Sequence, residues 1–244
     1  MTTHGRQAAP TLERQPRAET AGCLERPLLA CGVVGPLLFV VAFLLEGATR
    51  PDYSAFQHPV SSLEIGELGW MQRANFVVTG LLVLAFAFGL RPAIRRYRGG
   101  IWASLLIGLV GIGLVGAGAF EPDPLSGYPP GAPMVLPKPT ATGGLHYLFS
   151  TPVFTALPAA ACVVGYRFAT SGRRLWAVYS VATAVAFLTA FALTSVAFGQ
   201  DPTLMPIGGL LQRLTLVIGL AWLAALAAHL LRRVPAGSES TGRA

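Results

Sequence analysis

The sequence predicts an all-α, polytopic membrane protein: a bundle of six transmembrane helices with both termini in the cytoplasm. Hydrophobic residues make up 53% of the 244 residues and charged residues only 12%, with a mean hydropathy of +0.57. Soluble domains carry about 25% charged residues, so a chain this apolar could not keep its surface hydrated. Six apolar segments, each near the ~20 residues that a bilayer requires, follow one another along the chain.

The predicted spans form a single transmembrane domain, residues 27–233, between two polar tails. The first apolar run is longer than the hydrophobic core of a secretory signal peptide, so we expect it to remain as the first span. Residues 1–26 and 234–244 are predicted to be disordered cytoplasmic tails. The spans are placed at about 28–46, 70–90, 100–120, 145–166, 175–198 and 209–231.

The spans differ in their polar and small residues. The second and sixth carry polar residues in their first turns, and the fourth contains Pro152 and Pro158. The third has no charged residue and is rich in glycine, which lets a neighbouring helix backbone approach closely. We interpret these glycines as packing residues: Gly108, Gly111, Gly113, Gly116 and Gly118.

The distribution of Lys and Arg predicts the orientation in the membrane, because cytoplasmic loops are enriched in positive charge. Away from the span entrances, the opposite side carries only Arg50 and Lys138. The net charge of +7 is therefore interpreted as a basic cytoplasmic face, and no nucleic-acid partner is expected. The cytoplasmic set is Arg6, Arg14, Arg17, Arg26, Arg91, Arg95, Arg96, Arg98, Arg167, Arg173, Arg174, Arg232, Arg233 and Arg243.

Polar and titratable residues gather at the predicted outer face. Spans two, four and six all enter the membrane from that face, so their first turns and the preceding loops share one layer. Two short patterns repeat there: Gly-x-x-Gln-Arg at 69–73 and 209–213, and Ala-Phe-x-x-Asp-Pro at 119–124 and 197–202. We take a ligand-binding site there to include Arg73, Arg213, Gln72, Gln212, Asn75, His58, Glu64 and Asp201.

Arg73 and Arg213 allow two interpretations. They could anchor the helices at the interface or pair with outer acids, or they could hold an anionic headgroup or carboxylate. We expect them to turn inward and to meet an acid or His146, because lipid offers no hydrogen bonds to the polar residues beside them.

Candidate catalytic residues are Asp123, Glu121 and His146. A carboxylic acid beside an apolar bundle can act as a proton donor, and imidazole titrates near neutral pH. Ser61-x-x-Glu64 has the spacing of a capping box, which gives Glu64 a structural alternative. The proline-rich loop at 121–144 is interpreted either as a lid over the outer face or as a passive connection.

No metal or cofactor site is predicted. The three cysteines, Cys23, Cys31 and Cys162, are widely spaced and odd in number. Only His58 and His146 lie on the outer side, whereas a zinc site needs three or four ligands. The chain has neither an H-E-x-x-H nor a G-x-S-x-G motif.

Three stretches carry a resemblance to a known family: HPVSSLEIGELGW at 58–70, FEPDP at 120–124 and TATGGLH at 140–146. Together with the six spans, they resemble the domain of unknown function 998 family of small bacterial and archaeal membrane proteins, over about 28–232. The resemblance implies a six-span fold in a membrane and implies no activity.

Three functional hypotheses follow. In the first, the protein binds an amphipathic or anionic lipid-like ligand at its outer face, with membrane lipid as its partner. In the second, it is a membrane enzyme that uses acid–base chemistry on a lipid or isoprenoid, for example a protonation-initiated cyclase. In the third, it is a structural subunit of a membrane complex. The sequence indicates no oligomeric state.

Overall fold

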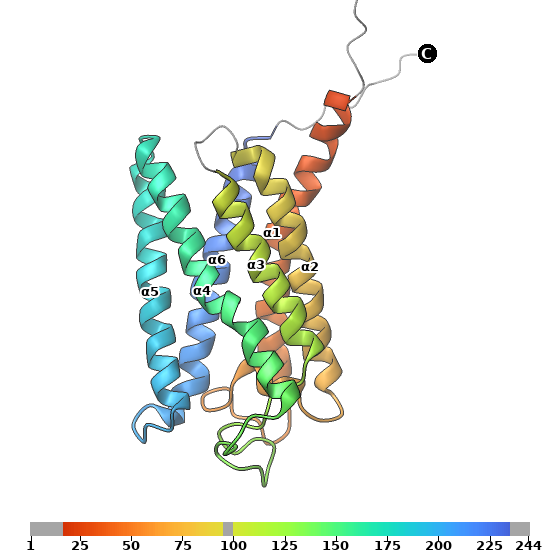
Figure 1. Ribbon diagram of the computed structural model, residues 1–244, viewed down its shortest axis with the longest axis vertical. Helices are drawn as coiled ribbons and strands as arrows, with labels where there is room; N and C mark the ends of the chain where they lie inside the picture. Colours follow the sequence, from red (N-terminus) through yellow and green to blue (C-terminus); the bar gives the residue numbers. More distant parts are fainter. Residues whose placement is uncertain (1–16, 95–99, 235–244) are drawn as a thin grey trace, which may run out of the picture.

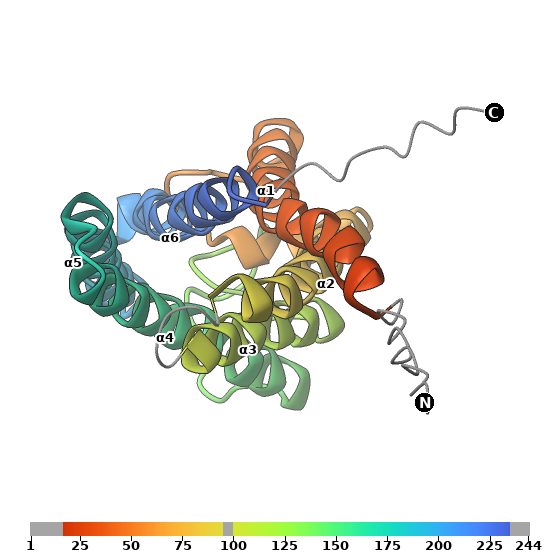
Figure 2. The ribbon, with the colours of Figure 1, turned by 90° about the horizontal axis from the view of Figure 1, so that it is seen from above.

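The computed structural model describes residues 17–94 and 100–234, and in these ranges the fold is a ring of six long helices (Figures 1 and 2). Each helix packs against the next in the chain, and the sixth returns to the first. Six helices of the described chain are long and apolar enough to cross a membrane, as predicted. The helices are α1 (Arg17–Thr49), α2 (Gly69–Ile94), α3 (Gly100–Ala119), α4 (Ala141–Thr170), α5 (Arg174–Phe198) and α6 (Gly208–Leu231), with two short 3-10 helices, η1 (Val60–Glu64) and η2 (Met205–Ile207).

The boundaries agree with the predicted spans to within a few residues, except at the start of α1. This helix begins at Arg17, so residues 17–26, predicted as part of a disordered tail, are helical. The apolar span that follows provides a nucleated helix, and the segment before Pro27 contains no proline to stop its extension. The rest of the two predicted tails, 1–16 and 235–244, lies outside the described residues.

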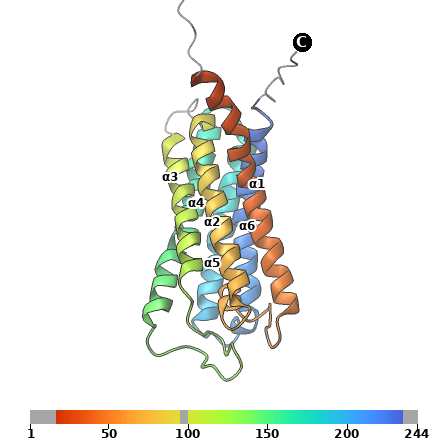
Figure 3. The same ribbon diagram turned by 90° about the vertical axis from the view of Figure 1, so that its right-hand side faces the viewer.

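Connections 50–68, 120–140 and 199–207 lie at one end of the bundle, which we call the loop end. Figure 3 shows the 120–140 connection lying across this end. The start of α1 and the end of α6 lie together at the other end (Figure 1). The loop end corresponds to the face predicted to be outside, and its sidedness in the membrane stays a prediction.

Glycines bring α2 and α3 into backbone contact, as the sequence predicted for the third span. A Cβ added at Gly80 would meet the carbonyl oxygen of Gly111, and one added at Gly111 would meet that of Gly80. The two backbones therefore cross at a distance that only glycine permits at both positions.

Helix α4 changes its packing partner along its length. Its first half packs against α3, where Phe149 covers Gly113 and Gly116, and its second half packs against α5, where Gly165 faces Ser180. Pro152 and Pro158 lie between the two halves and interrupt the backbone hydrogen bonds of the helix. As a result, α4 and α5 separate toward the loop end (Figure 1).

Candidate functional site

Arg213 holds the first connection at the loop end, residues 50–68. Its Nη1 donates hydrogen bonds to the carbonyl oxygens of Ala55 at 2.7 Å, His58 at 3.1 Å and Gly209 at 3.0 Å, and Nη2 donates to the hydroxyl of Tyr53. The residue is only 6% exposed. It turns inward as predicted, but in the described chain its partners are carbonyls and a phenol rather than an acid or His146.

The rest of the first turn of α6 contacts the same connection. A Cβ added at Gly209 would collide with the carbonyl oxygen of His58. The backbone N–H of Leu210 donates to the carbonyl of Phe56 at 2.9 Å, and Oε1 of Gln212 accepts from the N–H of Val60 at 2.7 Å. The side-chain oxygen of Gln212 is therefore bonded to the loop, and its amide nitrogen can donate hydrogen bonds to another partner.

The matching segment of α2 holds the other end of this connection. Gly69 leaves room for the carbonyl of Glu64, with which a Cβ would collide. Arg73 Nη2 donates to that carbonyl at 3.3 Å and to Oε2 of Glu121 at 2.9 Å. The Arg73 and Glu121 side chains are 38% and 44% exposed. The two Gly-x-x-Gln-Arg segments therefore fasten opposite ends of one loop.

The remaining polar residues of α2 face α1. Asn75 Nδ2 donates to Oε1 of Gln72 at 3.1 Å and to the carbonyl of Phe39 at 3.2 Å. Thr79 donates to the carbonyl of Gly35 at 3.5 Å. This stripe joins two helices inside the apolar bundle, where unpaired polar groups are costly.

Two of the predicted acids stabilise local backbone. Asp123 Oδ2 accepts from the N–H of Thr140 at 3.0 Å and Oδ1 accepts from its hydroxyl at 2.6 Å, immediately before α4. Asp201 Oδ1 accepts from the N–H groups of Thr203 and Leu204, both at 3.0 Å. These side-chain acceptors complete a helix start and a turn.

His58 belongs to an aromatic cluster that joins the two longest loops. Its ring lies 5.4 Å from that of Tyr53 and 5.1 Å from that of Tyr128, measured between centroids, and its Nδ1 accepts from the N–H of Ser54 at 2.9 Å. Burial, followed by the nearby charge of Arg213, lowers the pKa of His58. Burial also raises the pKa of Tyr53 to about 12. Both groups are therefore neutral at physiological pH.

Glu64 and His146 form a buried pair that sequence reasoning did not connect. Glu64 is fully buried, and in the described chain neither oxygen of its carboxyl has a hydrogen-bond partner. Oε1 lies 3.7 Å from Nδ1 of His146. Burial raises the pKa of Glu64 to about 9, although the charge of Arg73 acts to lower it. Glu64 therefore carries a proton at neutral pH.

The capping-box interpretation of Glu64 is wrong. Residues 60–64 do form a short helix, but it is a 3-10 helix whose N-cap is Pro59, with no side-chain cap. The carboxyl points into the bundle instead of returning to the backbone. Ser61-x-x-Glu64 spacing fits the first turn of an α-helix, and the loop does not adopt that turn.

The hydrogen bonds of His146 fix its tautomer. Nδ1 lies 2.9 Å from the carbonyl oxygens of both Ala117 and Phe120, at the end of α3. Because a carbonyl oxygen only accepts, Nδ1 carries the hydrogen, and in the neutral ring Nε2 is an acceptor. Of the acids in the described chain, Glu64 is the one in direct contact with this histidine, at 3.7 Å.

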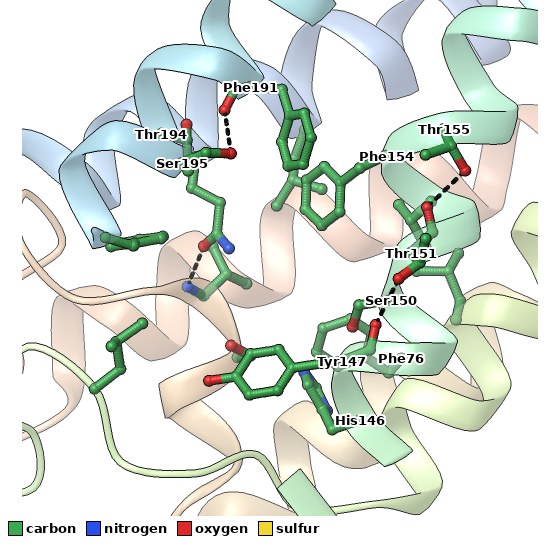
Figure 4. Close-up of a pocket in the computed structure, with 18 of the residues that line it drawn as sticks. Phe76, His146, Tyr147, Ser150, Thr151, Phe154, Thr155, Phe191, Thr194 and Ser195 are labelled. Carbon is green, nitrogen blue, oxygen red and sulfur yellow. Dashed lines mark hydrogen bonds between the residues drawn. The ribbon is translucent and has the colours of Figure 1, made fainter. Parts of the chain in front are cut away.

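A cavity of about 530 Å³ opens beside His146, between the separated halves of α4 and α5 (Figure 4). Its mouth carries exposed Thr151, Thr155 and Ser195. Phe154 and Phe191 stack at 4.7 Å on the side away from the loops. Val60 from the first loop, and Leu125 and Val135 from the 120–140 connection, form the wall of the cavity at the loop end, and the role of this connection as a lid stays a prediction. The lining also includes Ser61, Phe76, Leu114, His146, Tyr147, Ser150, Val153, Thr194, Phe198, Gly199, Gln212 and Leu216.

Of the predicted site residues, only His146 and Gln212 belong to this lining. The cavity is built by hydroxyl residues of α4 and α5 that the sequence analysis did not select. The available signal was the pairing of serines and threonines in spans four and five with two prolines in span four. Among the described residues, no three His, Cys, Asp or Glu side chains come together as a metal site.

The ring of six apolar helices with a side cavity defines a multi-pass α-helical membrane protein. The chain belongs to the family described as protein of unknown function (DUF998), which matches residues 33–229. This confirms the resemblance drawn from the three sequence stretches. No curated protein and no solved structure matches the chain.

Proposed function

We propose that this protein binds an amphipathic, lipid-like molecule in the cavity between α4, α5 and α6. The observation that carries the proposal is the position of the cavity mouth. It lies between two membrane-spanning helices, where exposed Thr151, Thr155 and Ser195 line an otherwise apolar opening. A molecule could enter from the bilayer without passing through water.

The size and lining of the cavity support such a ligand. Its volume of about 530 Å³ is within the range of roughly 300–1,000 Å³ typical of small-molecule sites. Aromatic and aliphatic side chains such as Phe154, Phe191 and Leu216 can contact a hydrocarbon chain. His146 and Gln212, nearer the loop end, can hydrogen-bond a polar head.

The two Gly-x-x-Gln-Arg segments at 69–73 and 209–213 act on the cavity only indirectly in this proposal. Arg73 and Arg213 fasten the loop that carries Val60 and Ser61, and these two residues form part of the cavity wall. The arginines therefore shape the site without contacting its occupant.

A second candidate function is acid–base chemistry on a bound lipid. It is favoured by the buried Glu64 and His146, 3.7 Å apart, because His146 also lines the cavity. In this case His146 Nε2 would accept a proton from the substrate as a general base. A changed product in a lipid extract incubated with the protein would distinguish an enzyme from a binding protein.

The proposal is tested by lipid mass spectrometry of the protein purified from its membrane in nanodiscs. Ser150→Trp would fill the cavity, whereas Leu148→Trp, on the same helix but 64% exposed, would leave it open. We expect a lipid that is enriched over the surrounding bilayer in the wild type and in Leu148→Trp, and lost in Ser150→Trp. Equal lipid content in all three proteins would contradict a binding site and favour a structural subunit.

A further inference from the structure

The hydrogen-bond chemistry of the cavity indicates which kind of polar head it accepts. Four hydroxyls of the lining already donate their only hydrogen to their own helix. Thr151 donates to the carbonyl of Tyr147 at 2.9 Å and Thr155 to that of Thr151 at 2.8 Å. Across the cavity, Thr194 donates to Ala190 at 2.8 Å and Ser195 to Phe191 at 2.9 Å.

While these bonds are kept, each of the four hydroxyls offers a ligand only its acceptor lone pairs. His146 adds another acceptor, since its Nδ1 hydrogen is directed to the carbonyls of Ala117 and Phe120 and Nε2 is the nitrogen left for a ligand. Figure 4 shows these residues on opposite sides of the cavity: His146, Thr151 and Thr155 from α4, and Thr194 and Ser195 from α5.

Donors in the lining are fewer. The amide nitrogen of Gln212 is one, because its oxygen is held by the N–H of Val60. The hydroxyls of Ser61, Tyr147 and Ser150 can rotate to donate or to accept. The polar head of a ligand that fits these donors and acceptors must donate a hydrogen bond and must also accept at least one hydrogen bond.

The charge of the cavity lining further limits the class of ligand. In the part of the chain that the structure describes, the cavity lining contains no lysine, arginine, aspartate or glutamate. Arg73 is engaged with Glu121 and Arg213 with loop carbonyls, so neither cation reaches the lining. A carboxylate or phosphate would face a lining made mainly of hydrogen-bond acceptors, and an ammonium would be buried without a counter-ion.

We propose that the ligand of this cavity is a neutral lipid alcohol, whose hydroxyl donates to an acceptor on the α4 wall, His146 Nε2 or the hydroxyl of Thr151 or Thr155, and accepts from Gln212. The inference rests on the proposed binding function and specifies its ligand class. It departs from the anionic headgroup that Arg73 and Arg213 suggested at the level of sequence.

The test uses three photoreactive probes with the same diazirine-bearing C16 chain: the alcohol, the carboxylic acid and the primary amine. Each is incorporated at equal mole fraction into nanodiscs that contain the full-length protein, and crosslinked peptides are mapped by mass spectrometry. We expect the alcohol to label the cavity faces of α4 and α5 about tenfold more than either of the others, the ratio that a single hydrogen bond of ordinary net strength can produce.

Two variants make the test specific for the acceptors. The double variant Thr151→Val and Thr155→Val keeps the shape of both side chains and removes two acceptors at exposed positions, so we expect alcohol labelling to fall several-fold. Thr170→Val is the matched control, because Thr170 also lies on α4 and donates to a backbone carbonyl, of Arg167 at 3.0 Å, but lies outside the cavity.

The outcomes separate the two proposals. Equal or stronger labelling by the acid or the amine would overturn the assignment to an alcohol while leaving a lipid-binding cavity. No labelling of the cavity faces by any probe would overturn the binding function itself. Loss of alcohol labelling in Thr170→Val as well would show that the valine effect is not specific to the cavity and would overturn the role of its acceptors.

Discussion

Nη1 of Arg213 lies 3.1 Å from the carbonyl oxygen of His58, so a cation at the start of the last helix holds the backbone of the first loop. Arg73 makes the corresponding bond to the carbonyl of Glu64 at 3.3 Å. Both arginines follow a glycine by four residues, and in both segments that glycine lets the loop backbone approach the helix. The two Gly-x-x-Gln-Arg segments thus make the same kind of contact between the start of a helix and the backbone of the loop.

The first prediction compares these two arginines. Arg213→Ala removes the donor to the partly buried carbonyl of Ala55 and one of the two donors to the carbonyl of His58, and an unpaired buried group costs about 1–3 kcal/mol. Arg73→Ala removes a partly exposed ion pair worth under about 1 kcal/mol. We expect a clearly larger fall in melting temperature for Arg213→Ala, measured in detergent by intrinsic fluorescence. A smaller fall in melting temperature than in Arg73→Ala would contradict the role of Arg213 in holding the carbonyl of His58.

The second prediction concerns Gly209. In Gly209→Ala, the added methyl group would collide with the carbonyl of His58, so either the loop or the helix must shift. We expect a loss of melting temperature and, if the cavity wall moves with the loop, weaker lipid retention. Gly144→Ala is the control, because nothing lies within 4 Å of its Cβ position and alanine favours a helix. Similar melting temperatures for the two variants would contradict the close approach.

Sequence reasoning located the helices well because hydropathy and length are local properties. It also identified the packing role of the glycines, as the contact of Gly80 with Gly111 illustrates. It did not find the partners of Arg213, because backbone carbonyls are present at every position and carry no sequence signal. The cavity was missed for a related reason, since it arises where α4 leaves α5 and the sequence shows only the two prolines between them.

The sequence also did not identify which acid lies beside His146. Asp123, Glu121 and Glu64 all precede or follow a span at the predicted outer face, and the sequence analysis chose Asp123 and Glu121 as the candidate proton donors. The structure distinguishes them by burial and by hydrogen-bond partners: Glu64 is 0% exposed beside His146 and, in the described chain, its carboxyl has no hydrogen-bond partner, whereas the buried Asp123 is bonded to Thr140 and the partly exposed Glu121 to Arg73. Burial depends on how the 50–68 loop folds back into the bundle, which is a tertiary property.

The third prediction concerns orientation. The excess of Arg in the tails and in the second and fourth loops predicts that the loop end faces outward. An alkaline phosphatase fusion at residue 130 should therefore be active, and one at residue 95 inactive. A green fluorescent protein fused at the same two positions should show the opposite pattern. Activity at residue 95 with none at residue 130 would invert the topology.

The last prediction uses the buried acid. Glu64 has a pKa of about 9 in the folded protein against an ordinary value of 4.5, mainly because of burial, with Arg73 opposing and Glu121 and Glu46 reinforcing the shift. Between these two values the folded protein keeps a proton that the unfolded chain has lost. Stability therefore falls as pH rises through this window, by at most about 1.4 kcal/mol for each pH unit.

Glu64→Gln removes this titration and keeps the shape of a protonated carboxyl. We expect the variant to match the wild type near pH 5 and to melt at a higher temperature at pH 8, because its amide needs no proton to remain neutral. Melting curves from pH 5 to pH 8 measure the difference, with Glu121→Gln as the control for removing a partly exposed carboxylate. If wild type and Glu64→Gln lose stability in parallel as pH rises, Glu64 is ionised in the folded protein, and the neutral pair with His146 is wrong.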